Sequence, residues 1–225
     1  MSELLAGLAV WALPVLLAIT LHEAAHGFAA QAMGDDTARR LGRVSLNPLR
    51  HVDPFGTVIL PLLLLAAGGI LFGWAKPVPV DFTRLRPARL GLIVVAAAGP
   101  AINLALAALA VLGFWLVPEV PEAFQGWLFA SLRALMEINL LLAVFNMLPI
   151  PPLDGGRVLT GLLPPRLGWR LARLEKVGLL VVLLGLFVLP LLGERAGINF
   201  DPLGWLVGGP VDSLAGALVG LLGPR

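Results

Sequence analysis

Two histidines and a glutamate near the N-terminus combine the residue types and the spacing that metal-assisted hydrolysis requires. His22 and His26 are four residues apart, so on a helix they lie on one face and can offer two imidazole nitrogens to one metal ion. Glu23 lies beside them, where its carboxylate can take a proton from a water molecule on that metal. The stretch therefore predicts a metal centre with Glu23 as the general base.

The motif lies inside an apolar run, residues 4–33, that is long enough to cross a membrane as one helix, for which about 20 residues suffice. Ionisable side chains are energetically expensive in hydrocarbon unless a metal ion or a partner compensates. The apolar surroundings therefore favour a metal site over a chance match to the motif.

The composition is that of an integral membrane protein. Of the 225 residues, 58% are hydrophobic and 13% are charged, about half the charge of a soluble domain, and the mean hydropathy is +0.91. The absence of cysteine excludes disulfides and thiolate ligands, so a metal must be held by His, Asp or Glu. The net charge of +2 does not indicate a nucleic-acid partner. We expect one membrane domain, residues 1–225, embedded in the lipid bilayer.

We predict an all-α polytopic fold with five to six transmembrane helices. A catalytic core at about 4–160 precedes accessory helices at about 168–222. Pro61 and the adjacent Gly68 and Gly69 make the apolar segment 54–74 a poor straight helix, so we expect it to re-enter or to be broken. The other predicted helices are at 4–33, 90–117, 127–148, 177–192 and 203–222.

Two stretches predict short extended strands near the active site. Residues 41–46 alternate weakly between polar and apolar side chains, which is typical of a strand or hairpin. Pro77 and Pro79 stand at alternate positions of the stretch 76–81 and favour an extended backbone there.

Basic residues are concentrated in the stretches 34–53, 74–89 and 157–176, which we interpret as loops. Because basic loops remain in the cytoplasm, we expect a multi-pass protein of the cell membrane with its N-terminus outside. The active site then faces the cytoplasmic side. If the first two loops are both cytoplasmic, the segment between them does not cross once, which agrees with re-entry.

A catalytic zinc site usually has three protein ligands and one open position. Asp154 follows the cytoplasmic end of the helix predicted at 127–148, and this topology brings it to the depth of the two motif histidines. The alternative is that Asp154 only turns the chain, as Asp-Gly often does. His51 is the other candidate, either on the substrate side of the site or as a solvated histidine.

Three stretches together resemble the site-2 protease family of intramembrane zinc metalloproteases. They are His-Glu-Ala-Ala-His at 22–26, Gly-Pro-Ala-Ile-Asn at 99–103 and Asn-Met-Leu-Pro-Ile-Pro-Pro-Leu-Asp-Gly-Gly at 146–156. Their order and spacing fit the family over about residues 15–160, in the compact bacterial and archaeal branch that has neither a PDZ nor a CBS domain. The resemblance implies regulated intramembrane proteolysis of a transmembrane protein substrate.

The same resemblance implies one Zn²⁺ per chain bound by His22, His26 and Asp154, with Glu23 as the base. It also implies that Asn103 and Asn146 lie near the active site and hold the substrate strand or the oxyanion. From the residues alone, each is an amide in an apolar helix that needs a partner, and for Asn103 a structural hydrogen bond between helices explains it equally well.

Two other functions use the same residues. A zinc-dependent membrane hydrolase of a lipid or another amide needs the same metal chemistry but a head-group pocket. A metal carrier needs intramembrane ligands along a path, and it does not need Glu23. The three histidines of the chain, His22, His26 and His51, are instead clustered toward one face.

Overall fold

The computed structural model describes residues 2–59, 63, 76–195, 197 and 204–224. The regular structure of these residues is helical, and no strand is present among them. In chain order the elements are α1 (Ser2–Ala32), α2 (Thr37–Arg40), η1 (Pro48–Arg50), η2 (Pro54–Ile59), α4 (Ala88–Gly113), η3 (Phe114–Glu119), α5 (Glu122–Asn146), α6 (Asp154–Leu162), α7 (Pro165–Ala172), α8 (Glu175–Leu183), η4 (Leu184–Val188), α9 (Leu189–Arg195), η5 (Gly204–Gly208) and α10 (Gly209–Leu222).

Four helical stretches of the described chain are long and apolar enough to cross a membrane. Lipid offers no hydrogen-bond partners to the backbone, whereas a helix pairs its own N–H and C=O groups. Apolar runs of this length therefore fold as helices in a membrane. The stretches coincide with four of the predicted helices, and the chain is an all-α polytopic membrane protein. They are Leu5–Ala32, Ala88–Glu119, Glu122–Asn146 and Gly204–Leu222.

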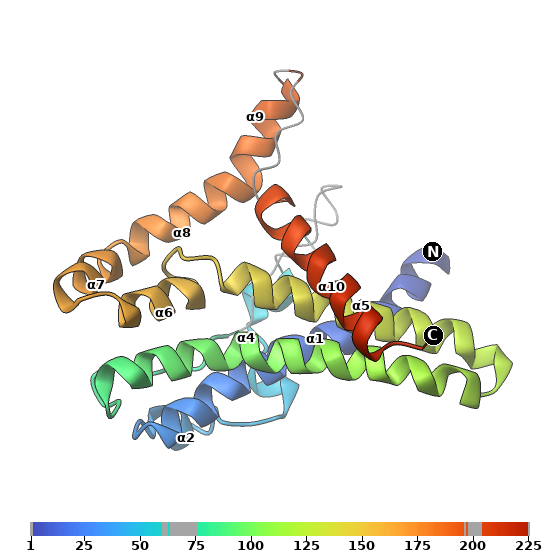
Figure 1. Cartoon of the computed structure of the whole chain (residues 1–225), viewed down its shortest axis with the longest axis horizontal. Coiled ribbons are helices and arrows are strands. Elements are labelled where there is room, and N and C mark those ends of the chain that lie inside the picture. The colour runs from blue at the N-terminus through green and yellow to red at the C-terminus, as the bar shows by residue number, and fades with distance from the viewer. Residues whose placement is uncertain (1, 60–62, 64–75, 196, 198–203, 225) are drawn as a thin grey trace.

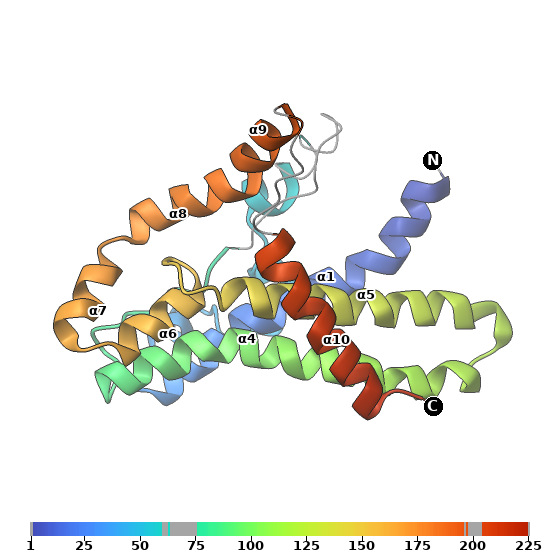
Figure 2. The same cartoon turned by 45° about the horizontal axis from the view of Figure 1, so that its top comes forward.

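Helices α1, α4 and α5 lie side by side, with α1 and α5 running in the same direction and α4 running opposite to both (Figure 1). The three stay together when the molecule is turned (Figure 2), and both chain ends lie at one end of this bundle while α6 and α7 lie at the other. The arrangement brings the C-terminal half of α1 next to the beginning of α4 and the end of α5.

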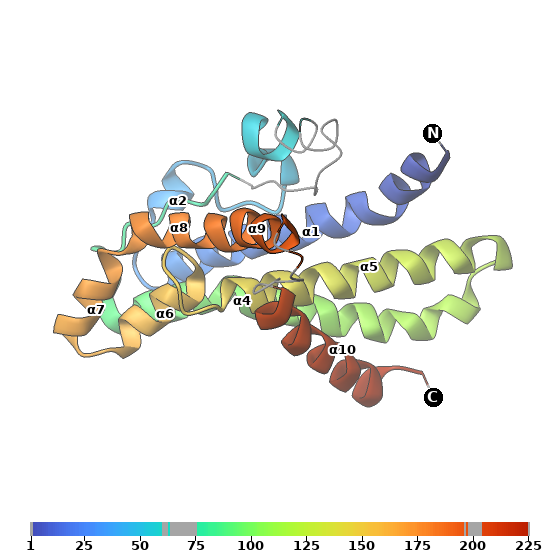
Figure 3. The ribbon, with the colours of Figure 1, turned by 90° about the horizontal axis from the view of Figure 1, so that it is seen from above.

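Small side chains allow α4 and α5 to pack closely. Ala107 and Ala110 of α4 are buried in one cluster with Leu140 of α5. Seen from above, α10 lies on the side of the α4–α5 pair opposite α1 (Figure 3). Helix α10 covers the cluster with four apolar side chains, namely Val211, Ala215, Leu218 and Leu222.

The helix predicted at 177–192 is helical but irregular, because α8 passes through the π-helical turn η4 into α9. Pro190 is the second residue of α9. Its ring has no N–H to donate and crowds the carbonyl four residues earlier, which favours a wide turn at that point. The stretch therefore does not form one regular spanning helix.

The loops differ from the sequence prediction in two places. Residues 41–46 form neither strand nor hairpin, because no second strand lies beside them in the described chain. The stretch 157–176 is largely helical, because it forms most of α6 and all of α7. The two helices pack closely at Gly168, where an added Cβ would lie only 2.5 Å from the Thr160 carbonyl oxygen, so only glycine permits this contact. The predicted re-entrant segment 54–74 lies mostly outside the described residues, which include only η2 and residue 63 of it.

Residues 76–82 form an irregular segment (the 76–82 segment) and not a strand. Pro77 and Pro79 have no N–H that could donate to a neighbouring strand. Side chains form hydrogen bonds with the backbone groups of adjacent residues instead. Arg43 Nη2 donates to the Lys76 carbonyl oxygen at 2.8 Å, which fixes the beginning of the segment.

A buried carboxylate fixes its other end. Asp35, directly after α1, is fully buried and accepts hydrogen bonds from the Asp81 N–H at 2.7 Å and from the Thr37 N–H at 3.0 Å. Burial raises the pKa of the Asp35 carboxyl, but the hydrogen bonds from Thr37 and Asp81 and the charge of Arg84 outweigh it, so the pKa lies below its ordinary value of 3.8.

We predict that Asp35→Asn lowers the free energy of unfolding by about 2 kcal/mol at pH 7, because one amide nitrogen then faces a buried donor. Because the folded-state pKa is depressed, the contribution of Asp35 is complete above about pH 5 and is lost as the pH falls through and below 3.8. Thermal unfolding in detergent from pH 7 to pH 3 measures both effects. The control Asp36→Asn, at a carboxylate whose side chain is 37% exposed, should cost less than about 1 kcal/mol. An equal loss in both variants would contradict the role of Asp35.

Candidate metal centre

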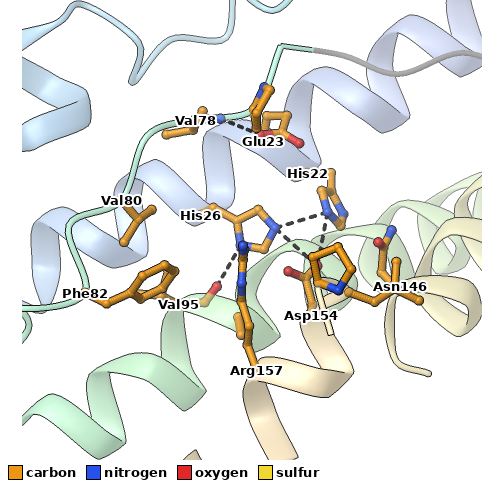
Figure 4. A pocket seen from close by; sticks show the side chains of 14 residues that line it. His22, Glu23, His26, Val78, Val80, Phe82, Val95, Asn146, Asp154 and Arg157 are labelled. Atoms are coloured by element: carbon orange, nitrogen blue, oxygen red, sulfur yellow. Dashed lines mark hydrogen bonds and ion pairs between the residues drawn. The ribbon is translucent and has the colours of Figure 1, made fainter. Parts of the chain in front are cut away.

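The three side chains predicted as metal ligands meet in the structure. His22 and His26 come from the C-terminal half of α1, and Asp154 is the first residue of α6. The two Nε2 atoms are 3.1 Å apart, and Asp154 Oδ2 is 3.3 Å from each of them (Figure 4).

This triangle has the size of a tetrahedral zinc site. Zinc bonds to imidazole nitrogen and carboxylate oxygen are about 2.0–2.1 Å long, which at the tetrahedral angle puts neighbouring ligand atoms about 3.3 Å apart. All three edges of the triangle agree with that spacing. Three protein ligands also leave the fourth position open.

Hydrogen bonds on the far side of each ring determine which nitrogen carries the proton. His26 Nδ1 lies 2.7 Å from the Val95 carbonyl oxygen, which can only accept, so Nδ1 donates. His22 Nδ1 lies 2.5 Å from Asn103 Oδ1 in the same way. In the neutral imidazoles that metal binding requires, both Nε2 atoms therefore present lone pairs to each other and to Asp154.

Three lone pairs thus converge with no hydrogen between them. Asp154 Oδ2 is buried and has no hydrogen-bond partner. A buried acceptor of this kind is costly unless a cation satisfies it, and a metal ion satisfies all three atoms at once. The donor set of two imidazoles and one carboxylate suits zinc.

The Asp154 carboxyl is held in its ionised form. Burial raises its pKa. When no metal is bound and the facing imidazoles carry protons, their hydrogen bonds and charges outweigh burial and lower the pKa to about 2. Asp154 is therefore an anionic ligand near neutral pH.

Glu23 opens onto the same pocket as the three ligand side chains. Its Oε2 accepts a hydrogen bond from the Val78 N–H at 2.8 Å, which places the 76–82 segment along one side of the pocket (Figure 4). Val80, Phe82 and Val95 add apolar lining. A carboxylate that faces a metal centre across a pocket has the position of a general base.

Asn103 is fully buried and does not line the pocket. Its Oδ1 accepts from His22, and its Nδ2 donates to Asn139 Oδ1 at 2.7 Å and to the Ala18 carbonyl oxygen at 3.3 Å. The amide therefore orients a ligand imidazole and links α1, α4 and α5. Asn139 was not among the residues singled out from the sequence, although it stands in α5 as an amide in an apolar helix.

Asn146 and His51 are the other two residues predicted near the substrate, and they lie in different places. Asn146 lines the pocket, and its Nδ2 donates to the Leu142 carbonyl oxygen of its own helix at 3.0 Å. His51 is buried, does not line the pocket, and bonds through Nε2 to the Ser45 carbonyl oxygen at 2.8 Å. The carbonyl oxygen of His51 accepts from the Lys76 N–H, so this residue supports the beginning of the 76–82 segment.

Glycine allows α4 to pass directly beside the ligands. A Cβ added at Gly99 would lie 2.5 Å from His22 Cε1 and from His26 Nε2, closer than any packed atoms. Neither ring can retreat freely, because each Nδ1 is hydrogen-bonded. Gly155 likewise lies against the backbone of Met147, which lets α6 begin at the metal centre.

A helical-bundle membrane protein with a buried His-His-Asp centre and an adjacent glutamate has the features of a metalloprotease. The sequence profile of peptidase family M50 matches residues 113–189. The "Putative zinc metalloprotease YwhC" of Bacillus subtilis (strain 168) is 41% identical over 184 residues, which are 79% of this chain and 79% of that protein. No solved structure matches the chain.

Two mycobacterial proteins extend the comparison. The "Putative zinc metalloprotease Rip2" of Mycobacterium tuberculosis (strain ATCC 25618 / H37Rv) is 37% identical over 192 residues, 85% of this chain and 70% of that protein. The Rip2 of Mycolicibacterium smegmatis is 34% identical over 180 residues, 80% of this chain and 66% of that protein. The chain belongs to peptidase family M50, the site-2 protease family of zinc metalloproteases.

We predict that Gly99→Ala weakens zinc binding by at least tenfold, because its methyl group displaces two ligand rings. Competition with a zinc chelator, followed by elemental analysis, measures the affinity. The matched control is Gly126→Ala in α5, where an added Cβ meets nothing within 4 Å. Unchanged zinc affinity in Gly99→Ala would contradict the placement of α4 against the ligands.

Proposed function

We propose that this protein is an intramembrane zinc endopeptidase that hydrolyses a peptide bond within or near the transmembrane segment of a membrane protein substrate. The observation that carries the proposal is the meeting of His22, His26, Asp154 and Glu23 at one pocket among membrane-spanning helices. Family membership supports the same reaction class.

In this proposal His22, His26 and Asp154 hold one zinc ion per chain. Zinc bound there supplies Lewis acidity, which acidifies a water molecule and polarises a carbonyl group. The Glu23 carboxylate takes one proton from that water as its oxygen adds to the scissile carbonyl carbon. Glu23 then gives the proton to the leaving amide nitrogen as the C–N bond breaks, so the carboxylate is regenerated.

The pocket accommodates an unwound chain. A helical substrate hides its carbonyl groups within its own hydrogen bonds, so it must open before attack. Pro77, Val78 and Val80 of the 76–82 segment line the pocket and offer backbone along which an extended substrate can lie. The Val78 N–H holds one oxygen of Glu23, which leaves the other oxygen free to accept the proton.

The site faces the cytoplasmic side of the cell membrane in this account. Arginines 39, 40 and 43 follow directly on α1, and Arg157 and Arg166 follow Asp154 at the same end of the bundle. Basic residues remain in the cytoplasm, so this end lies there. Water then has a short path to the pocket.

We predict that Glu23→Gln keeps about one zinc per chain but lowers the rate of cleavage by about 10²–10⁴-fold, the usual contribution of a general base. The protein is reconstituted in vesicles with a single-span substrate, and zinc is measured on the same sample. The matched control Glu122→Gln, at an exposed carboxylate of the first turn of α5, should cut like wild type. Zinc transport across the vesicle by both wild type and Glu23→Gln, without cleavage, would favour a metal carrier instead. Release of lipid fragments by wild type alone would favour a lipid hydrolase.

A further inference from the structure

Arg157 is a cationic side chain that the sequence did not single out and that opens onto the pocket of the metal centre. It stands one turn after Asp154 on α6, so the two side chains lie on the same face of that helix. Figure 4 shows it among the side chains that line the pocket, together with His26 and Asp154. Among the described pocket-lining residues, Arg157 carries the one permanent positive charge.

Two contacts orient the guanidinium. Arg157 Nη2 donates to Glu175 Oε1 of α8 at 2.9 Å, and its Cζ lies 5.2 Å from the centroid of the Phe82 ring. A guanidinium has five N–H donors, and the Glu175 contact engages one of its nitrogens. The remaining donors have no side-chain or backbone acceptor among the described residues, and the side chain lines the pocket.

Most of the other side-chain donors of the pocket are occupied, and Asn146 Nδ2 keeps one unused N–H. Both imidazoles donate through Nδ1 away from the pocket, and Asn146 Nδ2 donates to the Leu142 carbonyl oxygen. Peptide hydrolysis places a negative charge on the former carbonyl oxygen, and preorganised donors aimed at that oxygen are among the strongest contributors to catalysis. Arg157 is the side chain that combines several unused donors with a positive charge.

We propose that Arg157 is a catalytic residue that stabilises the oxyanion of the substrate. This inference rests on the proposed function. As the water oxygen bonds to the carbonyl carbon and Glu23 takes the proton, the π electrons of the carbonyl move to its oxygen, which then accepts hydrogen bonds from Arg157. When the C=O bond re-forms and the C–N bond breaks, the charge disappears. Arg157 keeps its protons throughout, and Glu175 and Phe82 hold it in position.

The experiment compares Arg157→Gln and Arg157→Lys with the matched control Glu175→Gln, which removes the ion pair but keeps the guanidinium. Full-length, zinc-loaded protein is reconstituted with a single-span substrate. We expect Arg157→Gln to lower kcat by about 10²–10³-fold with KM and zinc content unchanged. Arg157→Lys should recover part of that loss, because it keeps the charge but not the planar fork. Glu175→Gln should lose less than tenfold.

A binding measurement gives a second readout. A phosphinic dipeptide with apolar side chains imitates the tetrahedral anion and suits a pocket lined by Val80, Phe82 and Val95. Its affinity should fall in Arg157→Gln by about the same factor as kcat, whereas the affinity for uncut substrate should not change. Equal losses in Arg157→Gln and Glu175→Gln, or unchanged phosphinate affinity, would show that Arg157 only connects α6 to α8. Wild type that binds zinc and phosphinate but cuts nothing would count against the proposed function and leave the binding comparison as the test of Arg157.

Discussion

The close approach of three hydrogen-bond acceptors, His22 Nε2, His26 Nε2 and Asp154 Oδ2, is the constraint on which the rest of the structure depends. Two imidazole nitrogens and a carboxylate oxygen lie 3.1–3.3 Å from one another, and when both imidazoles are neutral no hydrogen lies between them. Without a cation, these groups repel one another in surroundings of low dielectric constant. A metal ion bound there would remove this repulsion, so we infer that it would support the packing of α1, α4, α5 and α6 as well as the proposed reaction.

Each supporting element serves that centre from a different direction. Helix α4 contributes Asn103 and the Val95 carbonyl oxygen, which hold the protons on the far side of both rings, and Gly99, which lets the helix approach. Helix α5 contributes Asn139, which supports Asn103. The 76–82 segment is fixed by Arg43 and Asp35 at its two ends and contacts Glu23 between them. In the proposed mechanism, the general base Glu23 is thus held by the same backbone along which the substrate lies.

The sequence predicted the helices well because hydrocarbon leaves an apolar run of 20 residues little choice of structure. Spacing and topology also predicted that Asp154 lies near the two histidines. The sequence did not predict the hydrogen-bond network of His22, Asn103 and Asn139. An amide in an apolar helix gives the same sequence pattern whether it contacts the substrate or a ligand imidazole. It did not predict α6, because a Gly-rich stretch with arginines has the composition of a loop. Without that helix the register that places Arg157 beside Asp154 was not visible, and strands at 41–46 and 76–81 were predicted where side chains satisfy the backbone instead.

The most direct test of the metal centre is X-ray absorption at the zinc edge on purified, full-length protein. The account predicts about one zinc per chain, with two imidazole nitrogens and one or two oxygens at about 2.0–2.1 Å and no sulfur in the coordination shell. Asp154→Ala should remove one oxygen and leave the imidazole signal. Zinc bound without imidazole scattering, or no zinc retained by wild type, would contradict the assignment of His22, His26 and Asp154 as its ligands.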